Sequence, residues 1–206
     1  MSEMVPIALG FKAGRGGSVV VGVAADGPEP RVVLSTYLRT ATEGDRLAFE
    51  PYHVAVEMVA GTQASHAEAE AAIAEGRRRQ DALAKEGLQA IVEDLRKAGH
   101  DPKLMALLIN RTGWLTDPIR LAHSLSAPEH PPVIEGLAVR DALRAAFDTC
   151  GLEAVEMDEK SLPESAAMRL SLSPAYVEGL GATVGRPWRK EQKLACLAAW
   201  VAAASL

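Results

Sequence analysis

Apolar residues cluster in three runs near the start of the chain, at residues 5–11, 17–24 and 31–39. The runs are nearly uninterrupted, which is typical of strands that are buried on both faces. Short segments containing glycine or proline separate them, so the pattern predicts an antiparallel meander of three strands. Two later runs, at 104–110 and 153–157, predict a fourth and a fifth strand.

Helical periodicity fills most of the chain between and after the later strands. The longest helix is predicted at about 65–98, where Ser65 and Glu68 form a capping box ahead of an apolar stripe. A helix of this length spans about 50 Å. A second helix is expected at about 133–150, and a helical C-terminal region at about 162–204.

The order of these elements predicts the architecture. A meander followed by strands that alternate with helices implies a mixed sheet, with the first strands antiparallel and the later ones parallel through right-handed crossovers. The expected fold class is therefore α/β, with a mixed five-stranded sheet flanked by helices in a single domain over residues 1–206.

Charge and composition narrow the classes of function. The net charge is −5, without the basic excess that duplex-binding domains usually show, although a local basic patch remains compatible with it. No apolar run reaches the length of a membrane span, and the first residues lack a secretory pattern. Cys150 and Cys196 form no C-x-x-C pair. We therefore expect a cytoplasmic protein of bacterial type with no membrane partner, no metal site and no cofactor.

The segment KAGRGG at residues 12–17 allows two interpretations. It is not a Walker A loop, because a strand follows it and no lysine precedes Ser18. A hairpin turn explains the glycines through their tolerance of positive φ. An anion-binding turn explains the cations, and the candidate anion-binding residues are Lys12, Arg15 and the more distant Lys190.

The element order resembles the ribonuclease H-like fold, which includes Holliday-junction resolvases of the RuvC type and actin-like ATPases. Residues 7–12, IALGFK, with the glycine-rich turn and the valines at 19–21, resemble the resolvase opening. Residues 104–110 are similar to the fourth strand of that fold, and 190–200 to its last helix. The chain also resembles uncharacterised bacterial proteins with a similar opening and a similar Pro-Trp-Arg segment.

The resemblance carries an expectation about the site. Active enzymes of this family need three or four carboxylates at these strand and helix ends, where they hold two Mg²⁺ ions. This chain has Lys12 where the resemblance calls for an aspartate, and its fourth strand ends in Asn110 without an acid. The resemblance thus implies a divergent domain that lacks the usual metal-binding carboxylates and binds nucleic acid or a phosphorylated small molecule.

Four further residues are candidates for acid–base chemistry: Glu135, Lys193, His53 and Glu57. Lys193 lies on an apolar side of the last helix, where a lysine either reaches solvent or meets a carboxylate, and Glu135 is the candidate partner. We hypothesise a Lys12–Glu135–Lys193 cluster at the carboxyl ends of the central strands; the alternative is separate surface charges. His53 and Glu57 are spaced i, i+4 and could form an acid–base pair.

Three functions remain open at this point. The first is the divergent ligand-binding domain, in which Trp114 and Trp188, beside Arg111, Arg186 and Arg189, either stack on a nucleic-acid strand or pack in the core. The second is a metal-independent acid–base enzyme of unknown substrate. The third is a structural or assembly protein that forms a homodimer through the long helix.

Overall fold

The computed structural model describes most of the chain, with several gaps. The described residues are 4–24, 26–27, 29–61, 64–110, 121–126, 131–170, 177, 179–180, 185 and 187–206.

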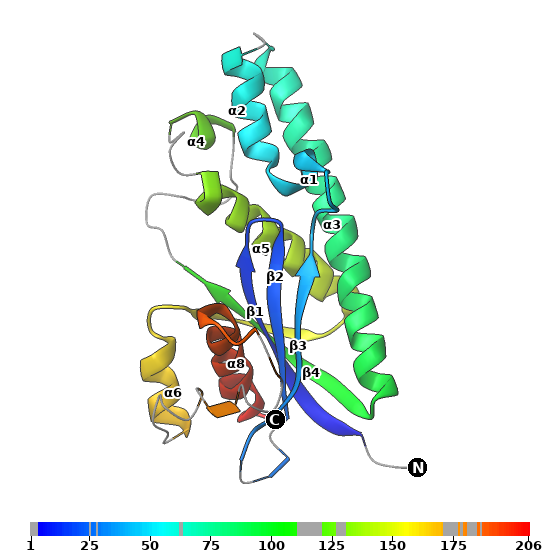
Figure 1. The fold of residues 1–206 in the computed structure, drawn as a ribbon, viewed down its shortest axis with the longest axis vertical. Coiled ribbons are helices and arrows are strands. Elements are labelled where there is room, and N and C mark those ends of the chain that lie inside the picture. Colours follow the sequence, from blue (N-terminus) through cyan, green and yellow to red (C-terminus); the bar gives the residue numbers. More distant parts are fainter. Residues whose placement is uncertain are drawn as a thin grey trace.

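A mixed sheet of five strands forms the centre of the molecule, as the sequence predicts (Figure 1). Its spatial order is β3-β2-β1-β4-β5. β1 pairs antiparallel with β2 and β2 antiparallel with β3, whereas β4 runs parallel to both β1 and β5. The strands are β1 (Val5–Gly14), β2 (Gly17–Ala24), β3 (Arg31–Arg39), β4 (His100–Ile109) and β5 (Glu153–Asp158).

Helices cover both faces of the sheet (Figure 1). One face packs against α3 and α5 through a core that includes Phe11, Leu88 and Leu143, and the other packs against α8 and α6. No helix in the described ranges is both long enough and apolar enough to span a bilayer. The helices are α1 (Arg46–Phe49), α2 (Pro51–Gly61), α3 (His66–Lys97), α4 (Leu121–Ser126), α5 (Pro131–Cys150), α6 (Leu162–Leu170) and α8 (Lys190–Ala203).

The long helix α3 begins where its capping box predicts. The Ser65 hydroxyl accepts the Glu68 N–H, and the Glu68 carboxylate accepts the Ser65 N–H at 2.8 Å. Its apolar stripe, with Leu88 and Val92, is buried against the chain's own core. The upper half of α3 extends past the sheet together with α1 and α2 (Figure 1). We call α1, α2 and residues 66–80 of α3 the helical lobe.

Helix α8 lies directly on β1 because Gly10 has no side chain. A Cβ at Gly10 would collide with the carbonyl oxygen of Ala195, so only glycine permits this approach. Farther along, Ala8 packs in the same cluster as Ala198 and Ala202. The two contacts show that α8 runs antiparallel to β1, which places the first turn of α8 at the carboxyl end of β1.

The glycine-rich segment is the hairpin turn between β1 and β2. Gly14 pairs with Gly17 across the hairpin. Gly16 has φ 76° and Gly17 φ 156°, values that side-chain-bearing residues rarely adopt. The prediction of a turn whose glycines take positive φ is confirmed.

Two predicted boundaries are wrong. The fourth strand was predicted to begin at residue 104, because the Asp-Pro-Lys sequence at 101–103 is typical of a turn, yet these residues lie inside β4, where Pro102 pairs with Ile7. Gly99, with φ 86°, already turns the chain, and the register shift after Ile7 accommodates the proline. Pro187 is typical of a first helical residue and predicts the start of the last helix there, yet α8 begins at Lys190, because Arg189 is still extended.

Candidate functional site

Lys12 lies near the carboxyl end of β1, on the face of the sheet that α8 covers. It pairs across the sheet with Val19, which packs against Cys196 of α8. Its ammonium group forms an ion pair with Glu159, at 2.6 Å between Nζ and Oε2. Glu159 follows β5 directly, and its N–H donates to the Ile109 carbonyl at 2.8 Å. This ion pair therefore links β1 to the chain beyond β5, across the end of β4.

We call this region the carboxyl edge: the ends of β1, β4 and β5 with the first turn of α8. The Lys12 and Glu159 side chains are 19% and 18% exposed, and Oε2, the Glu159 oxygen that Lys12 contacts, is itself buried. An ion pair in such a half-buried place is stronger than a fully exposed one, since less solvent screens it.

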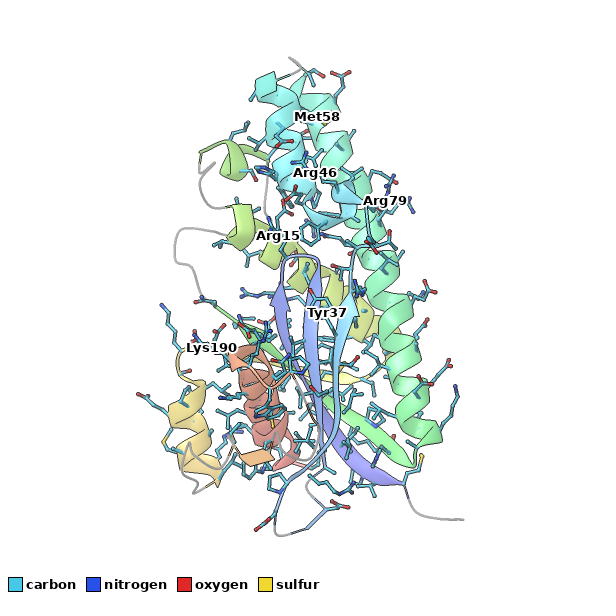
Figure 2. The ribbon with its side chains drawn as sticks, in the orientation of Figure 1. Arg15, Tyr37, Arg46, Met58, Arg79 and Lys190 are labelled. Carbon is cyan, nitrogen blue, oxygen red and sulfur yellow. The ribbon has the colours of Figure 1, made fainter. Side chains whose placement is uncertain are left out.

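The first turn of α8 adds cations to the carboxyl edge. Lys190 is exposed and, within the described part of the chain, makes no ion pair. Figure 2 shows Lys190 at the start of α8. Lys193 is half-buried one turn later. The Arg189 N–H is satisfied by the Gln192 side chain at 3.0 Å.

Glu135 does not join Lys12. It is fully buried on α5, and its Oε1 accepts the His53 backbone N–H at 2.9 Å, in the first turn of α2. The pKa of Glu135 is raised to about 8, and burial is the main cause. The Glu50 carboxylate also raises this pKa, whereas backbone hydrogen bonds from His53 and Tyr52 oppose the shift. The predicted cluster is corrected accordingly: the carboxylate beside Lys12 is Glu159, and Glu135 instead caps the helical lobe.

His53 and Glu57 share a face of α2 as their spacing predicts, at 3.3 Å between Nε2 and Oε1. Glu57 also pairs with Arg46 at 2.7 Å, and the hydrogen bond from Arg46 lowers the pKa of Glu57. Arg46 in turn holds Glu50 at 2.6 Å. A carboxylate held by an arginine is a weak proton acceptor, so this arrangement is better suited to joining α1 and α2 than to general-base chemistry.

Arg15, at the tip of the hairpin, reaches the same network. Its guanidinium pairs with Glu50 at 3.3 Å and lies over the Phe49 ring, 4.9 Å from the centroid. Figure 2 shows Arg15 and Arg46 where the hairpin meets the helical lobe. The predicted anion-binding residues are thus divided: Lys12 and Lys190 lie at the carboxyl edge, whereas Arg15 is paired with the lobe.

The residues of the carboxyl edge do not fit a two-metal centre. Two Mg²⁺ ions would need several carboxylate oxygens close together. At the β1 position where the resemblance calls for an aspartate, the ammonium group of Lys12 is present instead. Within the described ranges, no three or more His, Cys, Asp or Glu side chains are grouped as metal ligands would be. We therefore derive no metal-dependent step.

The predicted tryptophan–arginine surface is only partly described. Trp114, Arg111 and Arg186 lie outside the described residues. The Trp188 indole N–H donates to the Val177 carbonyl at 3.2 Å, and its ring packs in the α8 core. Trp188 therefore packs in the core, whereas Arg189 is exposed.

The sequence patterns did not indicate Glu159, nor Tyr37 and Arg39 near the end of β3. The available signal for Glu159 was an acid directly after a predicted parallel strand, since such positions gather at one edge of the sheet. For Tyr37 the signal was alternation along β3: Leu38 is buried, so its two neighbours face the opposite side of the sheet.

Comparisons with known proteins show the fold. No family model matches the chain, and no curated protein matches it. Among solved structures, RuvC from Thermus thermophilus overlaps with a TM-score of 0.54 at 11% identity, covering 96% of this chain and 93% of that one. T. thermophilus RuvC in complex with a Holliday junction substrate gives 0.53 at 12% identity, covering 96% and 92%. The yeast mitochondrial Holliday junction resolvase Ydc2 gives 0.52 at 11% identity, covering 96% and 81%. The chain thus has the RuvC-like, ribonuclease H-like fold that its element order resembles.

Proposed function

We propose that the chain binds nucleic acid, or another phosphorylated ligand, through phosphate groups at the carboxyl edge, without two-metal hydrolysis. The observation that carries this proposal is the partly exposed Lys12–Glu159 ion pair, which puts a cation near the end of β1. The net charge of −5 means that binding depends on this local arrangement and not on a basic surface overall.

A phosphate group can use the carboxyl edge in two ways. A phosphate oxygen is a charged hydrogen-bond acceptor for Lys12, as the Glu159 carboxylate is. A bound phosphate therefore pairs with Lys12 beside Glu159 or in its place. It also meets Lys190 and the positive end of the α8 dipole, which favour an anion at the same edge. Glu159 opposes the phosphate by repulsion, so its charge sets the affinity.

The structural neighbours favour nucleic acid over a small phosphorylated molecule. One of them is a RuvC bound to a Holliday junction, and it overlaps with nearly all of this chain. Because the identity is 12%, the overlap supports the class of ligand without fixing which nucleic acid is bound.

A binding titration tests the proposal. Labelled four-way junction, duplex and single-stranded DNA are titrated with the full chain, by fluorescence anisotropy, over a series of salt concentrations. Affinity is expected to fall steeply with salt, because phosphate contacts release counterions. Absence of binding to any of the three at low salt would refute the proposal.

Matched variants locate the binding surface. Lys12→Gln is expected to weaken binding about tenfold and to reduce the salt slope by about one. Glu159→Gln is expected to strengthen binding, since it removes a competing carboxylate. The control is Lys103→Gln: Lys103 also pairs with an acid at 2.6 Å, Asp101, but lies near the amino end of β4. Equal effects of Lys12→Gln and Lys103→Gln would place the binding surface elsewhere.

A further inference from the structure

A second candidate site lies at the end of β3, between the hairpin turn and α1. A cavity of about 500 Å³ opens there, within the range of small-molecule sites. Its walls include two aromatic rings, Tyr37 and Phe49, and four charged side chains, which are Arg39, Glu43, Asp45 and Arg46. Figure 2 shows Tyr37 on β3 below Arg46 and the helical lobe.

The two rings are exposed although the chain has few aromatic residues. Tyr37 is 47% exposed and Phe49 36%, in a chain with only three phenylalanines and three tyrosines. The hairpin glycines hold them there: a Cβ at Gly16 would strike the Phe49 ring, and one at Gly17 the Tyr37 ring. The glycine-rich turn therefore supports both partly exposed rings from below, and Arg15 lies over the Phe49 ring, which leaves Tyr37 the more open of the two.

Some charged side chains of the pocket already have an ion-pair partner, and others do not. Arg46 is paired with Glu50 and Glu57, and Asp45 is paired with Arg79. Arg39 and Glu43 are exposed, and within the described residues neither forms an ion pair. One cation and one carboxylate thus remain for a ligand, beside the two rings.

We propose that this pocket binds a nucleotide unit, that is, a nucleobase together with its phosphate. A base presents a π face that stacks on Tyr37 or Phe49, as bases do in single-strand binding proteins. The phosphate pairs with Arg39. Glu43 accepts from an exocyclic amino group or a ribose hydroxyl, which are donors that a simple phosphate ester lacks.

The position of the pocket allows two sources for that unit. Lys12, Val19 and Tyr37 are cross-strand neighbours on the same face of the sheet, so the pocket lies two strands, or about 10 Å, from the carboxyl edge. A single strand bound at the carboxyl edge could therefore place an unstacked nucleotide in the pocket. A free nucleotide could occupy it alone, so the inference does not depend on the proposed function.

Isothermal titration calorimetry with the full chain tests the proposal in two arms. One arm uses the free mononucleotides AMP, GMP, CMP and UMP, with ribose 5-phosphate and inorganic phosphate for comparison. The other uses a single-stranded DNA 12-mer. We expect at least one arm to bind, and a mononucleotide that binds to do so at least tenfold more tightly than ribose 5-phosphate. Equal affinity for ribose 5-phosphate, or no binding in either arm at millimolar concentration, would overturn the proposal.

Substitutions separate this pocket from the carboxyl edge. Tyr37→Leu and Phe49→Leu keep apolar bulk and remove the ring, and at least one is expected to weaken binding ten- to a hundredfold. Arg39→Gln is expected to weaken it about tenfold; the control is Arg31→Gln, at the other end of β3. Thermal unfolding confirms that each variant is folded. If Lys12→Gln abolishes binding of the 12-mer and neither ring substitution changes any affinity, the pocket is refuted while the proposed function stands.

Discussion

Helix α8 and the helical lobe are joined to the rest of the molecule by different means. On the α8 face, small apolar residues bring backbone against backbone, as Gly10 does against Ala195. The helical lobe packs on α5 through an apolar cluster that includes Tyr52, Ile73 and Ile134, and it also uses buried polar groups: inside the lobe the Gln80 amide donates to the Ala48 carbonyl at 2.7 Å, and Glu135 of α5 caps α2. Arg79 adds an ion pair with Asp45.

The difference determines which changes destabilise each region. Close backbone packing tolerates no added atom but is indifferent to pH and salt. Polar attachment through a buried carboxyl responds to pH, because the group must change its charge inside the fold. We therefore expect the two regions to fail under different changes.

The largest effect is expected at Gly10. Gly10→Ala places a methyl group against the Ala195 carbonyl, in the central strand, so β1 and α8 must separate. We expect a loss of about 3 kcal/mol or more in the free energy of unfolding, measured by urea denaturation. Gly14→Ala is the control on the same strand, because nothing lies within 4 Å of its Cβ position. Similar losses in both variants would contradict the close-packing argument.

A smaller and local effect is expected at Gly76, inside the helical lobe. A Cβ there would collide with the Leu47 carbonyl oxygen and the Pro51 Cβ, so Gly76→Ala should detach α1 and α2 from α3. Hydrogen exchange is expected to rise over residues 46–61 while the sheet stays protected.

The control for Gly76 lies in the same helix. The nearest atom to a Cβ at Gly87 is a Leu38 side-chain carbon at 3.4 Å, an ordinary contact. Gly87→Ala is therefore expected to stabilise the chain by up to about 1 kcal/mol through helix propensity. Loss of protection in the sheet of Gly76→Ala would show that the lobe and the sheet unfold together.

The next effect is a pH dependence that Glu135 gives to the lobe. Burial raises the pKa of Glu135 to about 8 in the fold; the Glu50 carboxylate also raises it and the Arg15 guanidinium lowers it. The folded chain therefore holds a proton that the unfolded chain has lost above about pH 5. Stability due to this group is fully present below that pH and falls as pH rises towards 8, by at most about 1.4 kcal/mol per pH unit.

Glu135→Gln removes this titration and keeps an acceptor for the His53 N–H. The variant is expected to match the parent near pH 5 and to exceed it in stability near pH 9, in urea unfolding at a series of pH values. Parallel pH profiles for the parent and Glu135→Gln would show that the carboxyl does not titrate in this range.

The sequence predicted most of the fold because local patterns and tertiary packing agree there. The apolar runs are strands, the capping box starts α3, and the glycines of the hairpin take positive φ. Prediction failed at residues 101–103, where Asp-Pro indicates a turn but pairing with β1 extends the strand. The local turn preference of Asp-Pro is overridden there by strand pairing with β1, which lies far away in the sequence.

The candidate site was less predictable for the same reason. Glu135 was predicted as the partner of Lys193, with an exposed surface charge as the alternative, and it is in fact buried. Its partner, however, is a backbone N–H 82 residues away, which no local pattern indicates. Lys12 was identified as a cation at the end of the first strand, but its partner Glu159 depends on how β5 ends beside β4.

The smallest effect is expected at Glu57. Its ion pair with Arg46 is 2.7 Å long, shorter than the 2.9 Å hydrogen bond from the His53 N–H to Glu135, but length alone does not set the contribution to stability. Glu57 is about half exposed, at 49%, so water and salt screen the pair, and Arg46 keeps its second partner Glu50 at 2.6 Å. Glu57→Gln is expected to leave the melting temperature unchanged within about 1 °C. A fall in the melting temperature of about 5 °C or more would show that this exposed ion pair contributes as much as a buried contact does.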